Sequence, residues 1–255
     1  MESLRKSPVA VVLAAGQGTR MKSDLPKVLC PVLGRPMIHY VLDALAAAGV
    51  QRVIAVVGYR AEDVKATLKE RKNVEYALQT ERLGTGHAVK MARGQLWEHE
   101  GPVIIVAGDS PMIQRQSLAA LLDHFYGAFP ACLLGTLKKD DPSGLGRIVR
   151  DERGEFAGIV EEKDATLPQR QIKEVNMSTY IFDCRELLHG LDLLKNDNRQ
   201  GEYYLTDCPG ILKREGKLVQ ALPILQPCEA LSINTPDELA AVEAEMLRLG
   251  YERAF

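Results

Sequence analysis

The segment VVLAAGQGTRMKSDLPKVL, residues 11–29, changes from apolar residues to glycines and then to cations, and this change indicates the fold. The apolar run at residues 9–15 predicts a strand that is buried on both faces. Gly16 and Gly18 follow at once, and glycine allows backbone N–H groups to approach an anion closely. Three cations come next: Arg20, Lys22 and Lys27. The segment therefore predicts a phosphate-binding loop or a tight turn with surface lysines, and Lys22 fits a solvated charge in either case.

Two well-known glycine motifs do not fit this loop. A P-loop requires GxxxxGK[ST], and no such run occurs in the sequence. A dinucleotide-binding fingerprint requires GxGxxG, but Met21 stands at the third glycine position and Pro26 interrupts the helix that should follow. The remaining interpretation is a glycine loop with fixed cations, as expected for a nucleoside triphosphate, and a nicotinamide-dependent oxidoreductase is disfavoured.

Apolar runs and amphipathic segments alternate along the first half of the chain. Further buried strands are predicted at residues 53–57, 74–78 and 103–107. Helices are predicted around residues 37–45, 61–69, 86–95, 118–125, 185–194, 207–215 and 236–249. This alternation indicates an α/β fold, a Rossmann-like and mostly parallel sheet with helices on both faces. After about residue 130, short strands with turn chemistry predict an antiparallel or mixed extension of the sheet.

The composition limits the possible partners and the compartment. The chain has 255 residues and a formal net charge of −2, so no overall basic field favours nucleic acid. No apolar run reaches the roughly 18 residues that span a bilayer. The five cysteines are odd in number and form no CxxC pair, as expected for reduced thiols in a cytoplasmic protein. We expect no nucleic-acid or membrane partner.

Seven motifs in order resemble those of the sugar nucleotidyltransferases. LAAGQGTRMKSDLPKVL fits the pattern G-x-G-T-R-M…P-K of that family. The others are QTERLGTGHA (79–88), GDSPM (108–112), DDPSGLGRI (140–148), GIVEEKDAT (158–166), EVN (174–176) and QGEYYLTD (200–207). The chain is most similar to the N-terminal uridyltransferase domain of the bifunctional N-acetylglucosamine-1-phosphate uridyltransferase/glucosamine-1-phosphate acetyltransferase family. The hexapeptide repeats of that family's β-helix acetyltransferase domain do not occur in this sequence, so acetyl transfer is not expected.

The resemblance implies a nucleotide-diphospho-sugar transferase fold and a reaction. One domain, residues 1–255, would comprise a nucleotide-binding lobe at about 1–130, a smaller β-rich sugar-binding lobe at about 131–235 and a C-terminal helix at 236–255. UTP and N-acetylglucosamine 1-phosphate would give UDP-N-acetylglucosamine and pyrophosphate by in-line attack on the α-phosphorus. Mg²⁺ would be the cofactor. Without a β-helix domain for trimerisation, a monomer or homodimer is expected.

The implied roles follow the chemistry of each side chain. Arg20 offers a planar fork of donors for the β- and γ-phosphates, and Lys27 would stabilise charge near the α-phosphate; these are the expected catalytic residues. Asp109 directly follows the strand at 103–107 and suits Mg²⁺, and the resemblance pairs it with Asn234. Substrate contacts are expected from Leu13, Ala14, Ala15, Gly16, Gly18, Gln79, Gly84, Thr85, Gly108, Gly146, Glu161, Asn176 and Asn234. Among these, Gln79 would contact the uracil edge, while Gly146, Glu161 and Asn176 would contact the sugar.

The chain departs from the family's usual residues on the base and sugar sides. Met177-Ser178 follows Asn176 where Thr-Gly is usual, and Arg82 stands where glutamine is usual. Ala107 and Leu145 stand where tyrosine is common. Two alternatives therefore stay open: a nucleotidyltransferase for a different sugar 1-phosphate or nucleotide, and a non-catalytic nucleotide-sugar-binding protein.

Overall fold

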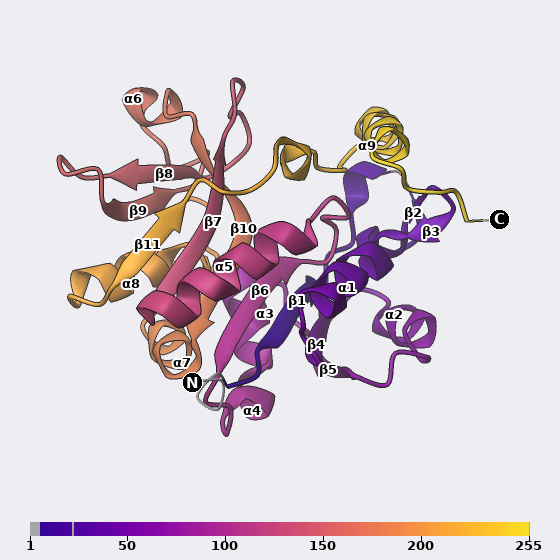
Figure 1. Ribbon diagram of the computed structural model, residues 1–255, viewed down its shortest axis with the longest axis horizontal. Coiled ribbons are helices and arrows are strands. Elements are labelled where there is room, and N and C mark those ends of the chain that lie inside the picture. The colour runs from indigo at the N-terminus through magenta and orange to yellow at the C-terminus, as the bar shows by residue number, and fades with distance from the viewer. Residues whose placement is uncertain (1–5, 22, 255) are drawn as a thin grey trace.

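The computed structural model describes residues 6–21 and 23–254, so the prediction for Lys22 lies outside the described residues. Within this part of the chain a nine-stranded mixed sheet runs through the molecule, with the main order β11-β7-β10-β6-β1-β4-β5 (Figure 1). The strands of this path are β11 (Val219–Leu222), β7 (Cys132–Lys138), β10 (Glu174–Asp183), β6 (Pro102–Ala107), β1 (Val9–Ala14), β4 (Arg52–Val57) and β5 (Val74–Leu78). The predicted apolar runs are thus neighbouring strands.

The pairing of the strands confirms the predicted architecture. β1 pairs in parallel with both β4 and β6, and β4 pairs in parallel with β5. β10 pairs antiparallel with β6 and β7, whereas the edge strand β11 is parallel to β7. The hairpin of β8 (Arg147–Arg150) and β9 (Phe156–Val160) joins this sheet through β8 and β10. The second half of the chain therefore extends one sheet rather than forming a separate one.

Helices cover both faces of the sheet. On one face α3 (Thr85–Met91), α4 (Arg93–Leu96), α7 (Cys184–Asp192) and α8 (Asp207–Arg214) share an apolar cluster with the odd-numbered residues of β1. On the other face α1 (Met37–Ala47), α2 (Ala61–Thr67) and α5 (Arg115–Ala128) share a second cluster with its even-numbered residues. β1 is apolar in continuous sequence because both of its faces are buried in this way.

The last helix, α9 (Pro236–Arg248), begins where the sequence predicts, with a capping box between Thr235 and Glu238. It packs through Val242 and Met246 against a third apolar cluster beside the short ribbon of β2 (Pro31–Val32) and β3 (Arg35–Pro36). Figure 1 shows the chain crossing from β11 through the short helix η4 (Pro227–Ala230) to α9 on the opposite side. This crossing places the segment before α9 beside the end of the parallel strands.

Some elements differ from the prediction. The single helix predicted at residues 86–95 is two helices, α3 and α4, separated at Ala92. The short elements β2, β3, β11 and α6 (Leu167–Arg170) were not predicted. Each of them has only two to four residues, which is too short for periodicity to reveal.

Candidate active site

The glycine loop folds back on itself because of Gly18. Its φ is +71°, and a Cβ added there would lie 2.6 Å from Cβ of Lys27. The backbone N–H of Lys27 donates to the carbonyl of Gly16 over 3.4 Å, which closes the loop. A side chain at position 18 would therefore push Lys27 away. Glycine is required at position 18 because the turn needs a left-handed φ and because the side chain of Lys27 occupies the space where a Cβ would lie.

Four predicted residues meet beside this loop. Nζ of Lys27 lies 2.6 Å from Oδ2 of Asp109 and donates to Oδ1 of Asn234 over 2.9 Å. Nη2 of Arg20 donates to the same Oδ1 over 2.9 Å. The side chains of Lys27 and Asp109 are 17% and 27% exposed, so solvent weakens their attraction only in part. We call Arg20, Lys27, Asp109 and Asn234 the charged cluster.

Asp109 is held by the end of β6. The N–H of Gly108 donates to the carbonyl of Leu13 over 2.9 Å, which ties the ends of β6 and β1 together. A Cβ at Gly108 would lie 2.9 Å from that same oxygen, so a larger residue would separate the two strands. Asp109 then leaves the sheet at its carboxyl edge, where ligands of open α/β sheets bind.

Asn234 reaches the charged cluster from the far end of the chain. Its N–H donates to Oε2 of Glu238 over 2.6 Å, and its Nδ2 donates to Oγ of Ser232 over 3.2 Å. The cap of α9 thus fixes the backbone of Asn234 and leaves its Oδ1 to accept from the two cations. Sequence spacing does not predict that Asn234 lies beside Lys27, whereas the family resemblance does.

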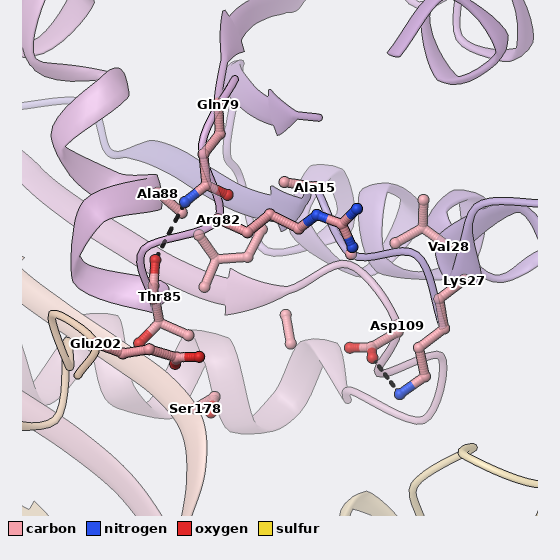
Figure 2. A pocket seen from close by; sticks show the side chains of 14 residues that line it. Ala15, Lys27, Val28, Gln79, Arg82, Thr85, Ala88, Asp109, Ser178 and Glu202 are labelled. Atoms are coloured by element: carbon pink, nitrogen blue, oxygen red, sulfur yellow. Dashed lines mark hydrogen bonds and ion pairs between the residues drawn. The ribbon is translucent and has the colours of Figure 1, made fainter. Parts of the chain in front are cut away.

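A pocket of about 320 Å³ opens next to the charged cluster (Figure 2). Its lining consists of Leu13, Ala15, Gly16, Lys27, Val28, Gln79, Arg82, Gly84, Thr85, Ala88, Ala107, Asp109, Ser178 and Glu202. Many predicted contacts are present in this set, while Ala14, Gly18, Arg20, Gly108 and Asn234 are not among the lining residues. Val28 and Ala88 lie inside two of the quoted motifs but were not predicted as contacts, because their apolar side chains do not suggest a role. Ser178 was predicted only as a departure from the family's usual residues.

Gln79 and Gly84 form a hydrogen-bonded wall of the pocket. Nε2 of Gln79 donates to the carbonyl of Gly84 over 3.2 Å and lies 3.1 Å from Nδ1 of His87. Gly84 has a φ of +105°, and a Cβ there would lie 2.6 Å from the carbonyl oxygen of Tyr203. The side chain of Gln79 is 5% exposed, so it is held in one orientation at the pocket (Figure 2). His87 thus helps to hold the side chain of Gln79 in place.

The predicted sugar-side residues form a second group. A Cβ at Gly146 would lie 3.5 Å from Cβ of Asn176 and 3.7 Å from Oε1 of Glu161. The backbone N–H of Asn176 donates to the carbonyl of Gly146 over 2.8 Å, and its Nδ2 donates to the Tyr180 hydroxyl over 2.7 Å. These residues lie together, outside the lining of the first pocket. Ser178 links the two regions, since its N–H donates to Oδ1 of Asn176 over 3.3 Å.

Glu161 carries a perturbed carboxyl group. Burial raises its pKa, and the negative charges of Asp207, Asp164 and Glu202 raise it further. The Thr206 hydroxyl opposes this shift by donating to Oε1 over 2.9 Å. A carboxyl group with a raised pKa beside other predicted site residues is a candidate for binding or catalysis.

The unusual pair after Asn176 forms a bulge. The pairing of β10 with β7 shifts register between Asn176 and Thr179, and Ser178 has a φ of +53°. Met177 packs against the apolar cluster beneath α1 and α5, while Ser178 lines the pocket. Ser178 is therefore the residue of this pair that reaches the pocket, and the side chain of Met177 packs in the apolar core.

The donor set beside Lys27 suits a hard divalent cation. Asp109 and Asn234 already direct two oxygens at one positive group, the Lys27 ammonium. No cluster of three or more His, Cys, Asp or Glu side chains suited to a metal occurs among residues 6–21 and 23–254. A magnesium site with few protein ligands needs no such cluster, because water and phosphate oxygens complete its shell.

None of the helices in the described part of the chain is long and apolar enough to cross a membrane.

The fold and the glycine-loop site define a class of protein. The chain belongs to the family of MobA-like NTP transferase domains, whose sequence profile matches residues 10–162. The chain is also 48% identical over 238 residues to the bifunctional protein GlmU of Geobacillus thermodenitrificans. It is 46% identical over 237 residues to that of Brevibacillus brevis. Each alignment covers 93% of this chain and 51% of the relative, so the chain spans about half the length of these curated relatives.

A solved structure confirms the predicted fold. The crystal structure of a UDP-glucose pyrophosphorylase complexed with UDP-glucose matches with a TM-score of 0.77. The match covers 95% of this chain and 99% of that one, at 16% sequence identity. At this identity the similarity establishes the nucleotide-diphospho-sugar transferase fold.

Proposed function

We propose that this protein is a sugar-1-phosphate nucleotidyltransferase that forms UDP-N-acetylglucosamine and pyrophosphate from UTP and N-acetylglucosamine 1-phosphate. The observation that carries this proposal is the charged cluster, in which Lys27 contacts both Asp109 and Asn234 at the edge of the pocket. The identity of 46–48% to two bifunctional GlmU proteins supports the choice of sugar and nucleotide. We further propose a cytoplasmic location and a monomer or homodimer.

The nucleotide would lie in the pocket with its phosphates along the glycine loop. Leu13, Ala14, Ala15, Gly16 and Gly18 would contact it through the backbone, together with Gln79, Gly84, Thr85 and Gly108. Backbone N–H groups in a glycine turn form a concave anion site, which fits a triphosphate. The fixed amide of Gln79 supplies polar groups for the uracil edge. This arrangement leaves the α-phosphorus close to Lys27.

The reaction requires positioning and charge stabilisation rather than covalent catalysis. An oxygen of the sugar phosphate attacks the α-phosphorus, a new O–P bond forms, and the bond to the β-phosphate oxygen breaks to release pyrophosphate. Lys27 would stabilise the charge that builds at the α-phosphate, and Arg20 would hold the leaving β- and γ-phosphates. The attacking oxygen is already anionic, so no general base is needed.

Asp109 and Asn234 are the residues that would hold the divalent metal ion, which we propose is Mg²⁺. When bound, the ion would neutralise phosphate charge and help to orient the triphosphate. On the second lobe, Glu161 would accept from a sugar hydroxyl and Asn176 would bond the sugar or its acetamido group. Gly146 would let the sugar approach the backbone, because a Cβ there would fill the space beside both of these side chains.

One specific observation favours a second candidate for the sugar substrate. Ser178 holds a left-handed φ of +53° at the pocket wall, where the related proteins usually have glycine. Its side chain adds bulk and a hydroxyl next to Asn176. A different hexose 1-phosphate is therefore the alternative substrate, and a protein that binds nucleotide sugars without turnover is the other alternative.

The proposal is tested by product analysis across a substrate panel. The enzyme is incubated with Mg²⁺, each of UTP, ATP, GTP, CTP and dTTP, and each of several sugar 1-phosphates, and the nucleotide sugars are identified by mass spectrometry. We expect UDP-N-acetylglucosamine as the main product. A different main product identifies the alternative substrate, and UTP binding without any product identifies a non-catalytic binder.

A further inference from the structure

Arg82 is a cation on the pocket wall that has no acidic partner in the described part of the chain. Two of the described residues that line the pocket, Lys27 and Arg82, are cationic. The charge of Lys27 is balanced by Asp109 over 2.6 Å. For Arg82 no ion pair is found within residues 6–21 and 23–254. Its positive charge is therefore available to a ligand in the pocket.

Neutral groups hold Arg82 against the glycine loop. Its Nη1 donates to Oε1 of Gln17, the residue between the two loop glycines, over 3.3 Å. Its guanidinium carbon lies 5.9 Å from the ring centroid of Tyr59. The N–H of Tyr59 in turn donates to the carbonyl of Ala15 over 3.2 Å, so this ring is attached to the same loop. Figure 2 shows the arginine extending from the Gln79 side of the pocket toward the side of Ala15 and Val28.

Among the described residues, most of the guanidinium donors of Arg82 have no hydrogen-bond partner. Arginine has five N–H donors, and the structure shows one of them bonded to Gln17. A planar fork of donors fits phosphate oxygens in pairs, and a partner-free charge beside a glycine loop favours an anion. Arg82 replaces the glutamine usual in related proteins, so this chain has a charge where they have an amide. Its contact with the loop places it nearer to the phosphate site than to the sugar side.

We propose that Arg82 is a substrate-binding residue that contacts the β- and γ-phosphates of the bound nucleotide and the pyrophosphate product. It would act as a third cation beside Arg20 and Lys27. This inference rests on the proposed function, because it assumes that the triphosphate lies along the glycine loop. A contact with the base would be a different role, and the dependence on phosphate number separates the two.

The test measures binding as a function of phosphate number. Isothermal titration gives the Kd of uridine, UMP, UDP, UTP and pyrophosphate with Mg²⁺ for the wild type, Arg82→Gln and Arg82→Lys. Arg93→Gln is the matched control, since Arg93 also lies over an aromatic ring, Trp97, but outside the pocket. We expect Arg82→Gln to raise the Kd of UTP and of pyrophosphate roughly 10-fold, which corresponds to the loss of one charge-assisted hydrogen bond. The Kd of uridine and of UMP should be unchanged, and Arg82→Lys should give intermediate Kd values for UTP and pyrophosphate.

Two results would overturn the role of Arg82. One is an equal loss of affinity for uridine and for UTP in Arg82→Gln, which would indicate that Arg82 contacts the base or has a structural effect. The other is UTP binding by Arg82→Gln equal to that of the wild type, which leaves the proposed function intact and removes only this inference. If the wild type itself binds no UTP in the presence of Mg²⁺, the proposed function fails and the role of Arg82 fails with it.

Discussion

The ammonium of Lys27 lies 2.6 Å from the carboxylate of Asp109, although the two residues follow different strands of the sheet. β1 and β6 are parallel neighbours, so the loops after them leave the same edge, and the two side chains meet there. Asn234 accepts a hydrogen bond from the same ammonium. The lysine therefore joins the glycine loop, the proposed metal ligands and the C-terminal helix cap in one place.

Removing this lysine should reduce turnover strongly. We expect Lys27→Ala to lower kcat by roughly 10²–10³-fold, because a contact made to charge in the transition state is lost. Steady-state pyrophosphate release measures this change. Lys72→Ala, an exposed lysine before β5, serves as the control and should retain full activity. Near-normal turnover of Lys27→Ala would refute its catalytic role.

Gly18→Ala should act on Lys27 through the backbone and through steric contact. The added Cβ would lie 2.6 Å from Cβ of Lys27 and would require a left-handed φ of +71°. Gly154→Ala is a matched control, because Gly154 has a φ of +78° in the β8–β9 turn with open space around its Cβ position. Both variants should lose about 1 kcal/mol of stability from the backbone conformation, measured by chemical denaturation. Only Gly18→Ala should also lose activity, and equal activity of the two variants would contradict the steric coupling.

Asp109→Asn should weaken the response to magnesium. One carboxylate charge is lost at the proposed metal site while the shape of the side chain is kept. A titration of Mg²⁺ at saturating UTP should show that half-maximal activity requires roughly 10–100-fold more metal, the range found when groups that support a metal site are removed. An unchanged midpoint would exclude Asp109 as a metal ligand.

Glu161→Gln should change the dependence of stability on pH. The pKa of Glu161 is raised in the folded protein, first by burial and then by neighbouring negative charges, despite the Thr206 hydrogen bond. The folded state therefore binds the proton more tightly than the unfolded state, so stability is lost as pH rises from the unfolded pKa through the folded one. The neutral amide avoids this loss. We expect the variant to have a Tm about 2–4 °C higher at pH 7 and equal to that of the wild type below about pH 4.

The control for this prediction is Glu152→Gln, which changes an exposed carboxylate in the β8–β9 turn. It should leave the Tm unchanged at both pH values. The same Glu161→Gln enzyme should show a higher KM for the sugar 1-phosphate. A difference in Tm that does not vary with pH would indicate that packing, not ionisation, causes it.

The parallel core and one side of the site follow from the sequence. Strands such as β1 and β6 are continuous apolar runs because both of their faces are covered, and residues directly after parallel strands must share an edge. This reasoning brings Lys27 and Asp109 together without a template. The place of Asn234 in the site was predicted only from the family resemblance, because the long crossing from β11 to α9 leaves no local signal in the sequence.

Other features depend on tertiary structure. The bulge that turns Ser178 into the pocket arises from a register shift between two paired strands. Because this position is a serine and not a glycine, the sequence does not indicate its left-handed φ. Arg82 is marked in the sequence only as a departure from the family, and its contact with Gln17 shows which part of the site it approaches. The break at Ala92 between α3 and α4 is not marked by a proline, so the apolar pattern runs through it.

The most direct test of the central claim is the rate of pyrophosphate release from UTP by the wild-type protein with Mg²⁺ and a sugar 1-phosphate. We expect turnover with N-acetylglucosamine 1-phosphate and a kcat/KM at least roughly 10²-fold lower with glucose 1-phosphate, because polar groups made for the acetamido group would be left unpaired. No pyrophosphate release with N-acetylglucosamine 1-phosphate, in a protein that binds UTP, would contradict the account.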